Sequence, residues 1–254
     1  MKILVAATEV FDPSIPLRLE TDGLNFEPAS AKLLLNPFDE VALNQAVIMK
    51  KLGQVTETIA VTIGLSTAMT TVLRPALALG IDRAIYVPFD GPLDGAVVAN
   101  ILRAVVEKEE PDLVIAGRQT SDNGMGQVGP YLAAKLCWAQ ATAITKLEVV
   151  DHGFHVASDM DGDTETRMIS MPAVVSVNLS LNTPPYLSLP SIMKARKAPI
   201  ERCSLEDLQV EPCHTDCRSF TIGYQEPPRR KAGIRIPDAQ ALAPIVAQVA
   251  GLAL

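Results

Sequence analysis

The segment from Gly117 to Pro130, GRQTSDNGMGQVGP, places spaced glycines among small polar residues directly behind the short apolar run DLVIA. Gly117, Gly124 and Gly126 allow the backbone to turn its N–H groups toward an anion. Pro130 suits the first turn of a helix, whose positive end would face the same anion. The segment therefore predicts either a phosphate-binding loop or a plain turn between a strand and a helix.

The side chains of this loop supply mainly neutral hydrogen-bonding groups. Arg118 adds one positive charge, and Asp122, when ionised, can only accept, from loop N–H groups or from a sugar hydroxyl. The remaining polar side chains are neutral donors: Gln119, Thr120, Ser121, Asn123 and Gln127. We therefore expect a nucleotide phosphate to be bound mainly through backbone N–H groups.

Motifs of phosphate-transfer and nucleophilic chemistry are missing from the sequence. No G-x-G-x-x-G follows the first apolar run, and no G-x4-G-K-[ST] supplies a P-loop lysine. No nucleophile elbow occurs, and the histidines, at positions 152, 155 and 214, lie away from the predicted strand ends. We expect a nucleotide site without catalytic residues.

Three of the four cysteines occur late in the chain, at positions 203, 213 and 217, and the fourth is Cys137. Cys213, His214 and Cys217 are metal-ligand types, but Cys-x3-Cys lacks the paired C-x2-C spacing of zinc modules. We interpret these residues as reduced thiols in a loop-rich tail and expect no metal site.

Short apolar runs alternate with amphipathic segments over the first 180 residues. The runs typical of buried strands are residues 2–7, 56–64, 83–88, 112–117 and 172–180. The helical patterns cover residues 36–53, 66–80, 93–109 and 129–138, with Pro75 bending or breaking the second. This alternation predicts an α/β fold, a doubly wound and mainly parallel sheet with helices on both faces.

Three segments should meet at the carboxyl edge of this sheet, where ligands bind in such folds. They are the end of the first strand, the NPFD sequence at 36–39, and the loop at 117–128. Within NPFD, Asn36 can cap the helix, and Asp39 stands at capping-box spacing.

The second part of the chain has a different pattern of apolar and polar residues. Residues 152–171 alternate and turn at Asp161-Gly162, which predicts a β-hairpin. From residue 182 the periodicity is lost and prolines accumulate, while residues 237–254 look helical again around Pro244. We expect a nucleotide-binding domain over residues 1–181 and an extended arm over residues 182–254. An arm of this length without a core of its own usually lies on another subunit.

Composition limits the functional classes. The 254 residues are 48% hydrophobic, enough for one large domain or one and a half. The net charge of −7 argues against a nucleic-acid partner. No apolar run is long enough to span a bilayer, and the first ten residues do not resemble a secretory signal. We expect a cytoplasmic protein, or one of an organelle matrix.

Five segments match sequence motifs of one known family, and the matches follow the family's order from Met1 to about Ile236. They are LNPFDEVALNQAVIMKK, LRPALALGIDRAIYV, GRQTSDNGMGQVGP, NTPPYLSLPSIMKARKAPIE and EPPRRKAGIRI. With them the chain resembles the beta subunit of electron-transfer flavoproteins. The resemblance implies an electron carrier, not an enzyme. It also implies a heterodimer whose alpha subunit carries most of an FAD site. The heterodimer would pass electrons from flavoprotein dehydrogenases to a quinone reductase or another acceptor.

The resemblance also implies AMP as a structural ligand of this subunit. Matched motif by motif, its contacts would be Ala6, Asn36, Pro37, Phe38, Asp39, Ile63, Gly117, Arg118, Gln119, Thr120, Ser121, Asp122, Asn123, Gly124, Met125, Gly126, Gln127 and Val128. By the same resemblance, residues 182–199 would form a partner-docking loop, and the C-terminal segment would pack on the alpha subunit. Within the loop, LSLPSIMKA would dock on dehydrogenases, with Leu189 at its tip as the apolar anchor.

Three departures from the family pattern leave alternatives open. Thr8-Glu9 replaces a basic pair, Ser158 replaces an arginine of the hairpin, and the loop ends in Gln127-Val128-Gly129-Pro130. That ending is similar to flavin-bifurcating members, whose beta subunit holds a second FAD in place of AMP. The NPFDE text, and Ala133-Ala134 where those members carry an acidic residue, favour AMP. A stand-alone adenine-nucleotide sensor would explain the loop and leave the arm without a use.

Overall fold

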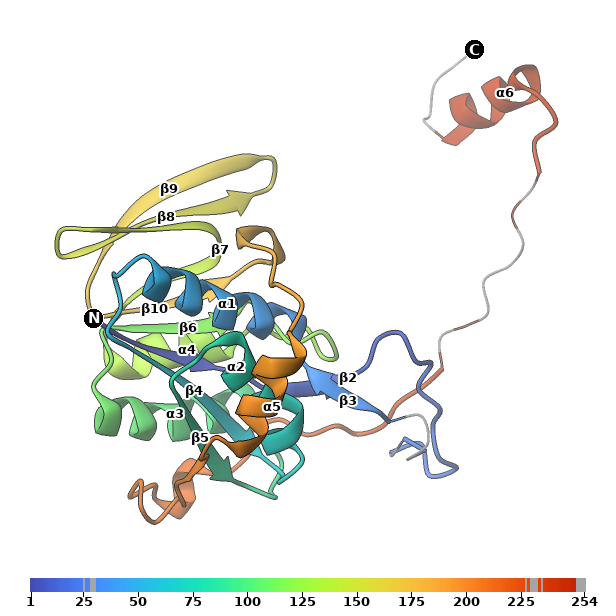
Figure 1. The fold of residues 1–254 in the computed structure, drawn as a ribbon. Helices are drawn as coiled ribbons and strands as arrows, with labels where there is room; N and C mark the ends of the chain where they lie inside the picture. The colour runs from blue at the N-terminus through green and yellow to red at the C-terminus, as the bar shows by residue number, and fades with distance from the viewer. Residues whose placement is uncertain (25, 28–30, 227, 229–232, 234, 250–254) are drawn as a thin grey trace. The chain divides into compact units, whose positions relative to one another are not determined.

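The structure is a computed structural model, and it describes the chain except residues 25, 28–30, 227, 229–232, 234 and 250–254 (Figure 1). It divides into two compact units, Met1–Ile222 and Gly223–Leu254, and each is described by itself. Among the described residues, no helix has the length and apolar character needed to cross a membrane.

The first unit is built on a nine-stranded sheet with the order β11-β5-β4-β1-β6-β10-β7-β8-β9. Its parallel strands are β1 (Lys2–Ala6), β4 (Glu57–Gly64), β5 (Arg83–Pro88), β6 (Leu113–Gly117), β10 (Ala173–Val177) and β11 (Glu201–Arg202). Strand β7 (Ala139–Val150) pairs parallel with β10 and antiparallel with β8 (Gly153–Met160), which pairs antiparallel with β9 (Asp163–Ser170). The mainly parallel sheet and the hairpin are confirmed.

The helices follow the predicted pattern closely. They are α1 (Pro37–Lys51), the π-helical turn η1 (Met69–Leu73) continuing into α2 (Arg74–Leu79), α3 (Gly95–Glu109), α4 (Val128–Leu136), α5 (Leu189–Lys197) and, in the second unit, α6 (Ala239–Val249). Two short 3-10 turns, η2 (Leu179–Leu181) and η3 (Pro212–His214), and an antiparallel pair, β2 (Glu9–Phe11) and β3 (Leu33–Leu35), complete the described elements. Pro75 lies in the first turn of α2 and marks the change from π to α geometry.

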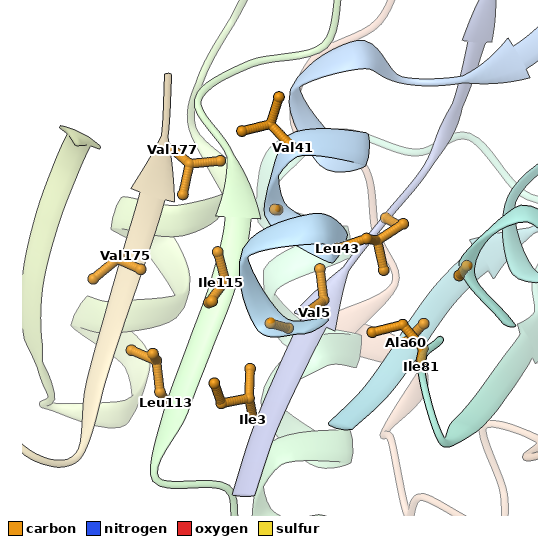
Figure 2. Packing of buried hydrophobic residues seen from close by; sticks show 14 of the residues in the cluster. Ile3, Val5, Val41, Leu43, Ala60, Ile81, Leu113, Ile115, Val175 and Val177 are labelled. Carbon is orange, nitrogen blue, oxygen red and sulfur yellow. The ribbon is translucent and has the colours of Figure 1, made fainter. Parts of the chain in front are cut away.

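Helices cover both faces of the sheet, α1 and α2 on one and α3 and α4 on the other (Figure 1). Along β1, Ile3 and Val5 pack toward α1, and Leu4 packs with the opposite cluster. Figure 2 shows Val41 and Leu43 of α1 over the row formed by Ile3, Val5, Leu113, Ile115, Val175 and Val177. Because successive side chains of a strand point to opposite faces and both faces are covered, these strands are continuously apolar.

Two features of the first unit differ from the sequence-based prediction. Strand β7, which we did not predict, joins the parallel sheet to the hairpin, and its residues alternate between buried and exposed only in part. The segment 182–199 is not extended throughout, because it contains helix α5. Ser188 caps α5 by accepting a hydrogen bond from the Ser191 N–H, and Pro190 lies in its first turn, where no N–H is needed.

Helix α5 is fixed to the body of the first unit. Arg74 of α2 donates from Nη1 to the carbonyl oxygens of Ala195 and Ala198, both at 2.6 Å. Residues 182–222 thus belong to the same compact unit as residues 1–181. In the second unit, α6 confirms the helix predicted around Pro244, and residues 250–254 of that prediction lie outside the described residues.

Candidate functional site

The carboxyl ends of β1 and β6 are joined by the side chain of Asp39, in the first turn of α1. Its Oδ2 accepts a hydrogen bond from the Thr8 N–H at 2.9 Å, and its Oδ1 accepts one from the Gly117 N–H at 2.9 Å. Asp39 is only 5% exposed. The structure therefore brings together the three segments that the sequence predicts to meet.

Asn36 fixes the loop that follows β6. Its Nδ2 donates to the Gln119 carbonyl oxygen at 2.9 Å, and its Oδ1 accepts from the Ser121 N–H at 3.3 Å. The predicted capping role of Asn36 is wrong, because its side chain makes no capping hydrogen bond to α1. The amide instead ties α1 to the loop, as the carboxylate of Asp39 does one turn later.

Gly117 is a glycine for reasons of packing. A Cβ at this position would lie 2.3 Å from Asp39 Oδ1 and 2.7 Å from Phe38 Cβ. We predicted from its residue type that Gly117 would help turn a free N–H group toward a ligand. Its N–H instead donates to Asp39 and is not free. The glycine allows α1 to approach the end of β6 closely.

Gly124 and Gly126 shape the loop through left-handed backbone conformations, with φ of +66° and +61°. The Gly124 N–H donates to the Thr120 carbonyl oxygen at 3.0 Å and closes a turn. Inside that turn, Asn123 Oδ1 accepts from the Met125 N–H at 3.0 Å, and Asp122 Oδ1 accepts from the Asn123 N–H at 2.7 Å. Asp122 thus accepts from a loop N–H, one of the two roles predicted for it.

Donors without a protein acceptor gather where the loop meets α4. In the described part of the chain, the N–H groups of Gly126, Gln127 and Val128 have no protein acceptor, and Gln127 makes no side-chain cap. The hydroxyl of Thr120 is buried in the same loop and likewise has no hydrogen-bond partner. Free N–H groups at the positive end of a helix form an anion-binding arrangement.

The electrostatics of the site are dominated by the buried carboxylate. Burial raises the pKa of Asp39 to about 7, although hydrogen bonds from the Thr8 N–H, the Asn36 side chain and the Gly117 N–H favour the ionised form. The carboxylate accepts from the backbone N–H groups of Thr8 and Gly117 and so holds the ends of β1 and β6 together. Arg118 is exposed, and its backbone N–H donates to the Val177 carbonyl oxygen at 2.9 Å.

The other predicted contact residues line the same edge. Ala6 is the last residue of β1, and Ile63 lies one residue before the end of β4. Pro37 and Phe38 are half-buried in the first turn of α1, whereas Met125 is exposed at the loop tip.

A cleft of about 250 Å³ lies next to Ile63, and its residues were missed by the sequence analysis. It is formed where β4 and β5 end, and Tyr86 donates from its hydroxyl to the Gly64 carbonyl oxygen at 3.0 Å. The cleft is lined by Gly64, Leu65, Ser66, Tyr86, Pro88, Phe89 and Asp90. The signal that could have indicated it is the position of these residues at the ends of two predicted strands.

The predicted docking residue Leu189 is the first residue of α5 and is 78% exposed. Tyr186 and Met193 are exposed beside it in the sequence. Lys194, Arg196 and Lys197 occupy the last turn of the same helix. Apolar and basic side chains therefore share this short segment.

Fold and site together define a doubly wound α/β protein with a donor-rich loop at the carboxyl edge of its parallel sheet. The family described as "Electron transfer flavoprotein domain" matches residues 24–208. The electron transfer flavoprotein subunit beta of Bradyrhizobium diazoefficiens is 40% identical over 252 residues, covering 99% of this chain and 100% of the relative. The relative named electron transfer flavoprotein subunit beta, mitochondrial, of Oryza sativa subsp. indica is 41% identical, with 92% of each chain covered. The electron transfer flavoprotein subunit beta of Homo sapiens is 35% identical, with 95% of each chain covered. The chain belongs to the beta-subunit family of electron transfer flavoproteins and is an electron-carrier subunit.

Proposed function

We propose that this subunit binds AMP as a structural ligand and works in a heterodimer with an FAD-carrying alpha subunit. The heterodimer takes electrons from flavoprotein dehydrogenases and passes them to a quinone reductase or another acceptor. Membership in the beta-subunit family supports the alpha partner. A cytoplasmic or mitochondrial-matrix location is part of the proposal, supported by bacterial relatives and by relatives named mitochondrial.

The observation that carries the AMP proposal is the set of free donors at the start of α4. The N–H groups of Gly126, Gln127 and Val128 have no protein acceptor in the described residues, and Thr120 Oγ1 is buried without a partner. A monophosphate group supplies acceptor oxygens for this set without requiring a cluster of cations. The phosphate would lie against the loop, and the nucleoside would extend along the strand ends toward Ile63.

A second FAD in this subunit is the competing candidate, favoured by the Gln127-Val128-Gly129-Pro130 sequence at the start of α4. It would make the protein a flavin-bifurcating carrier. The two ligands differ in their phosphates, because FAD carries a diphosphate and needs donors for both groups. The free donors named above are three N–H groups and one hydroxyl, enough for one phosphate, which favours the single phosphate of AMP.

The exposed apolar segments are proposed as partner surfaces. Residues 182–199, with Leu189 at the start of α5, would dock on dehydrogenases through one apolar anchor, and the basic residues of α5 would steer the encounter. In α6, Leu242, Ile245, Val246 and Val249 are exposed in the second unit, which supports packing of this segment on the alpha subunit. We therefore propose that residues 1–181 bind the nucleotide and that residues 182–254 form an arm that binds partners.

The test is to purify the heterodimer, denature it and identify the nucleotides released. One AMP and one FAD per heterodimer are expected. Two FAD and no AMP would establish the bifurcating alternative, and a single FAD with no second nucleotide would contradict the phosphate site.

A matched pair of variants links the nucleotide to the loop. Gly126→Val places a β-branched side chain at a positive φ, with its Cβ 3.0 Å from the Arg118 carbonyl oxygen. Gly162→Val carries a similar backbone cost in the turn of the hairpin, where nothing lies within 4 Å of the added Cβ. Only Gly126→Val is expected to lose AMP. Equal AMP content in both variants would remove the loop from the binding site.

A further inference from the structure

A turn outside the nucleotide site gathers three side chains of metal-ligand type. A carboxylate oxygen of Glu211, the Sγ of Cys213 and an imidazole nitrogen of His214 lie within 4.8 Å of one another, and all three residues are exposed. Oxygen, sulfur and nitrogen in one such set match the donors that zinc uses in proteins. Calcium and magnesium, which prefer oxygen ligands alone, do not fit it.

The backbone of the turn sets the positions of these side chains. Pro212, Cys213 and His214 form the 3-10 turn η3, with the His214 N–H donating to the Glu211 carbonyl oxygen at 2.9 Å. The Pro212 carbonyl oxygen accepts from both the N–H and the hydroxyl of Thr215, at 3.0 and 2.8 Å. Residues i, i+2 and i+3 are thereby held in one tight turn, and the proline ring restricts its first residue.

Helix α3 and its N-cap residue Asp94 hold the chain at the end of this turn and just beyond it. Asn100 Nδ2 donates to the His214 carbonyl oxygen at 2.8 Å. A few residues later, the carboxylate of Asp94 accepts from the N–H groups of Arg218 and Ser219, at 2.8 and 3.2 Å. Because the backbone is fixed at the last ligand and a few residues after it, less conformational entropy is lost when a cation binds.

The charges of the cluster favour a cation. Cys213 Sγ lies 3.6 Å from Glu211 Oε2. The carboxylate beside the sulfur adds negative charge that stabilises a bound cation, and binding of a metal through the sulfur releases the thiol proton.

We propose that Glu211, Cys213 and His214 bind one Zn²⁺ ion through three protein ligands, with solvent completing a tetrahedral shell. The sequence analysis did not expect this site, because it compared Cys213 with Cys217, whose spacing is unlike that of zinc modules. Cys217 Sγ instead contacts the Ser219 carbonyl oxygen at 2.9 Å and is not part of the cluster. The other two ligands lie closer to Cys213 in the sequence, since Glu211 is two residues before it and His214 is one residue after it.

The test measures zinc binding by the metal-free, tag-free heterodimer in competition with a chromogenic chelator. Cys213→Ser and His214→Gln each remove one ligand and are expected to weaken binding at least about tenfold. Cys217→Ser removes a neighbouring, half-buried thiol and Cys137→Ser a distant, exposed one, and each is expected to change zinc binding by less than about twofold. Any zinc held by the alpha subunit is common to all variants and cancels in the comparison.

Cobalt provides an independent readout of the same ligands. Co²⁺ bound at this site should give a thiolate-to-metal charge-transfer band that Cys213→Ser abolishes and Cys217→Ser retains. The AMP content of each variant serves as the folding control. The proposal is overturned if the four variants bind zinc alike, if loss follows Cys217→Ser instead, or if no zinc binds at micromolar concentration.

Discussion

Gly117→Ala tests the close contact between β6 and the first turn of α1. The added Cβ would lie 2.3 Å from Asp39 Oδ1 and 2.7 Å from Phe38 Cβ, distances that real Cβ atoms do not adopt. The first turn of α1 must therefore move, and the hydrogen bond from the Gly117 N–H to Asp39 is lost with it. Since Asp39 also holds the Thr8 N–H, the strain reaches the end of β1.

The expected loss of stability can be worked from these contacts. A hydrogen bond to a charged group contributes about 1.5–3 kcal/mol, and overpacking a core costs about 1–3 kcal/mol. The two costs overlap, because relieving the clash is what breaks the bond, and we expect about 3 kcal/mol in all. At roughly 2–4 °C per kcal/mol for a chain of this size, the melting temperature should fall by roughly 6–12 °C.

The assay is thermal unfolding of the heterodimer at pH 8, where Asp39 is ionised, with AMP content measured in parallel. Gly129→Ala is the matched control, because its Cβ would lie at an ordinary 3.6 Å from Ser176 Cβ in the first turn of α4. The control should stay within about 1 kcal/mol of the parent, since alanine favours a helix by up to that amount. If Gly117→Ala unfolds at the same temperature as Gly129→Ala, the contact has no energetic role and the reasoning is refuted.

The remaining predictions concern pH, the anchoring of α5, and docking. Because the pKa of Asp39 is about 7 in the folded chain and ordinarily 3.8, the folded state binds more protons between these values, and the contribution of Asp39 to stability falls as pH rises through them. In urea unfolding, Asp39→Asn should therefore lower the free energy of unfolding by more at pH 5 than at pH 8. A loss of the same size at both pH values would contradict the raised pKa of Asp39. Arg74→Lys removes the paired hydrogen bonds to Ala195 and Ala198 and should cost about 1–2 kcal/mol, seen as faster hydrogen exchange at the end of α5, whereas exchange in α1 stays constant. Leu189→Ala should slow reduction by a dehydrogenase with AMP content unchanged, and Leu52→Ala, at another exposed leucine, should not; equal rates for both would remove Leu189 from docking.

The sequence predicted those elements whose pattern is local. Residues 2–7, 56–64, 83–88, 112–117 and 172–180 each contain at least three consecutive apolar residues, which is typical of a strand covered on both faces, and all form parallel strands. The position of the glycine-rich loop followed from the same rule, since it stands after one of these strands. Strand β7 and helix α5 were missed because their residues are partly exposed and carry no clear period.

What the sequence could not give is the use of each polar side chain. Asn36 and Asp39 have the spacing of a capping box, and local chemistry alone assigns them to their own helix. The folded chain brings Thr8, Gly117 and Gln119 within hydrogen-bond distance, and these partners, more than twenty residues away, take the two side chains instead. Capping satisfies groups that water can also reach, whereas Asn36 and Asp39 are buried and their side chains must find partners within the protein. The sequence alone thus determined which segments meet, and the tertiary structure decided which atoms bond.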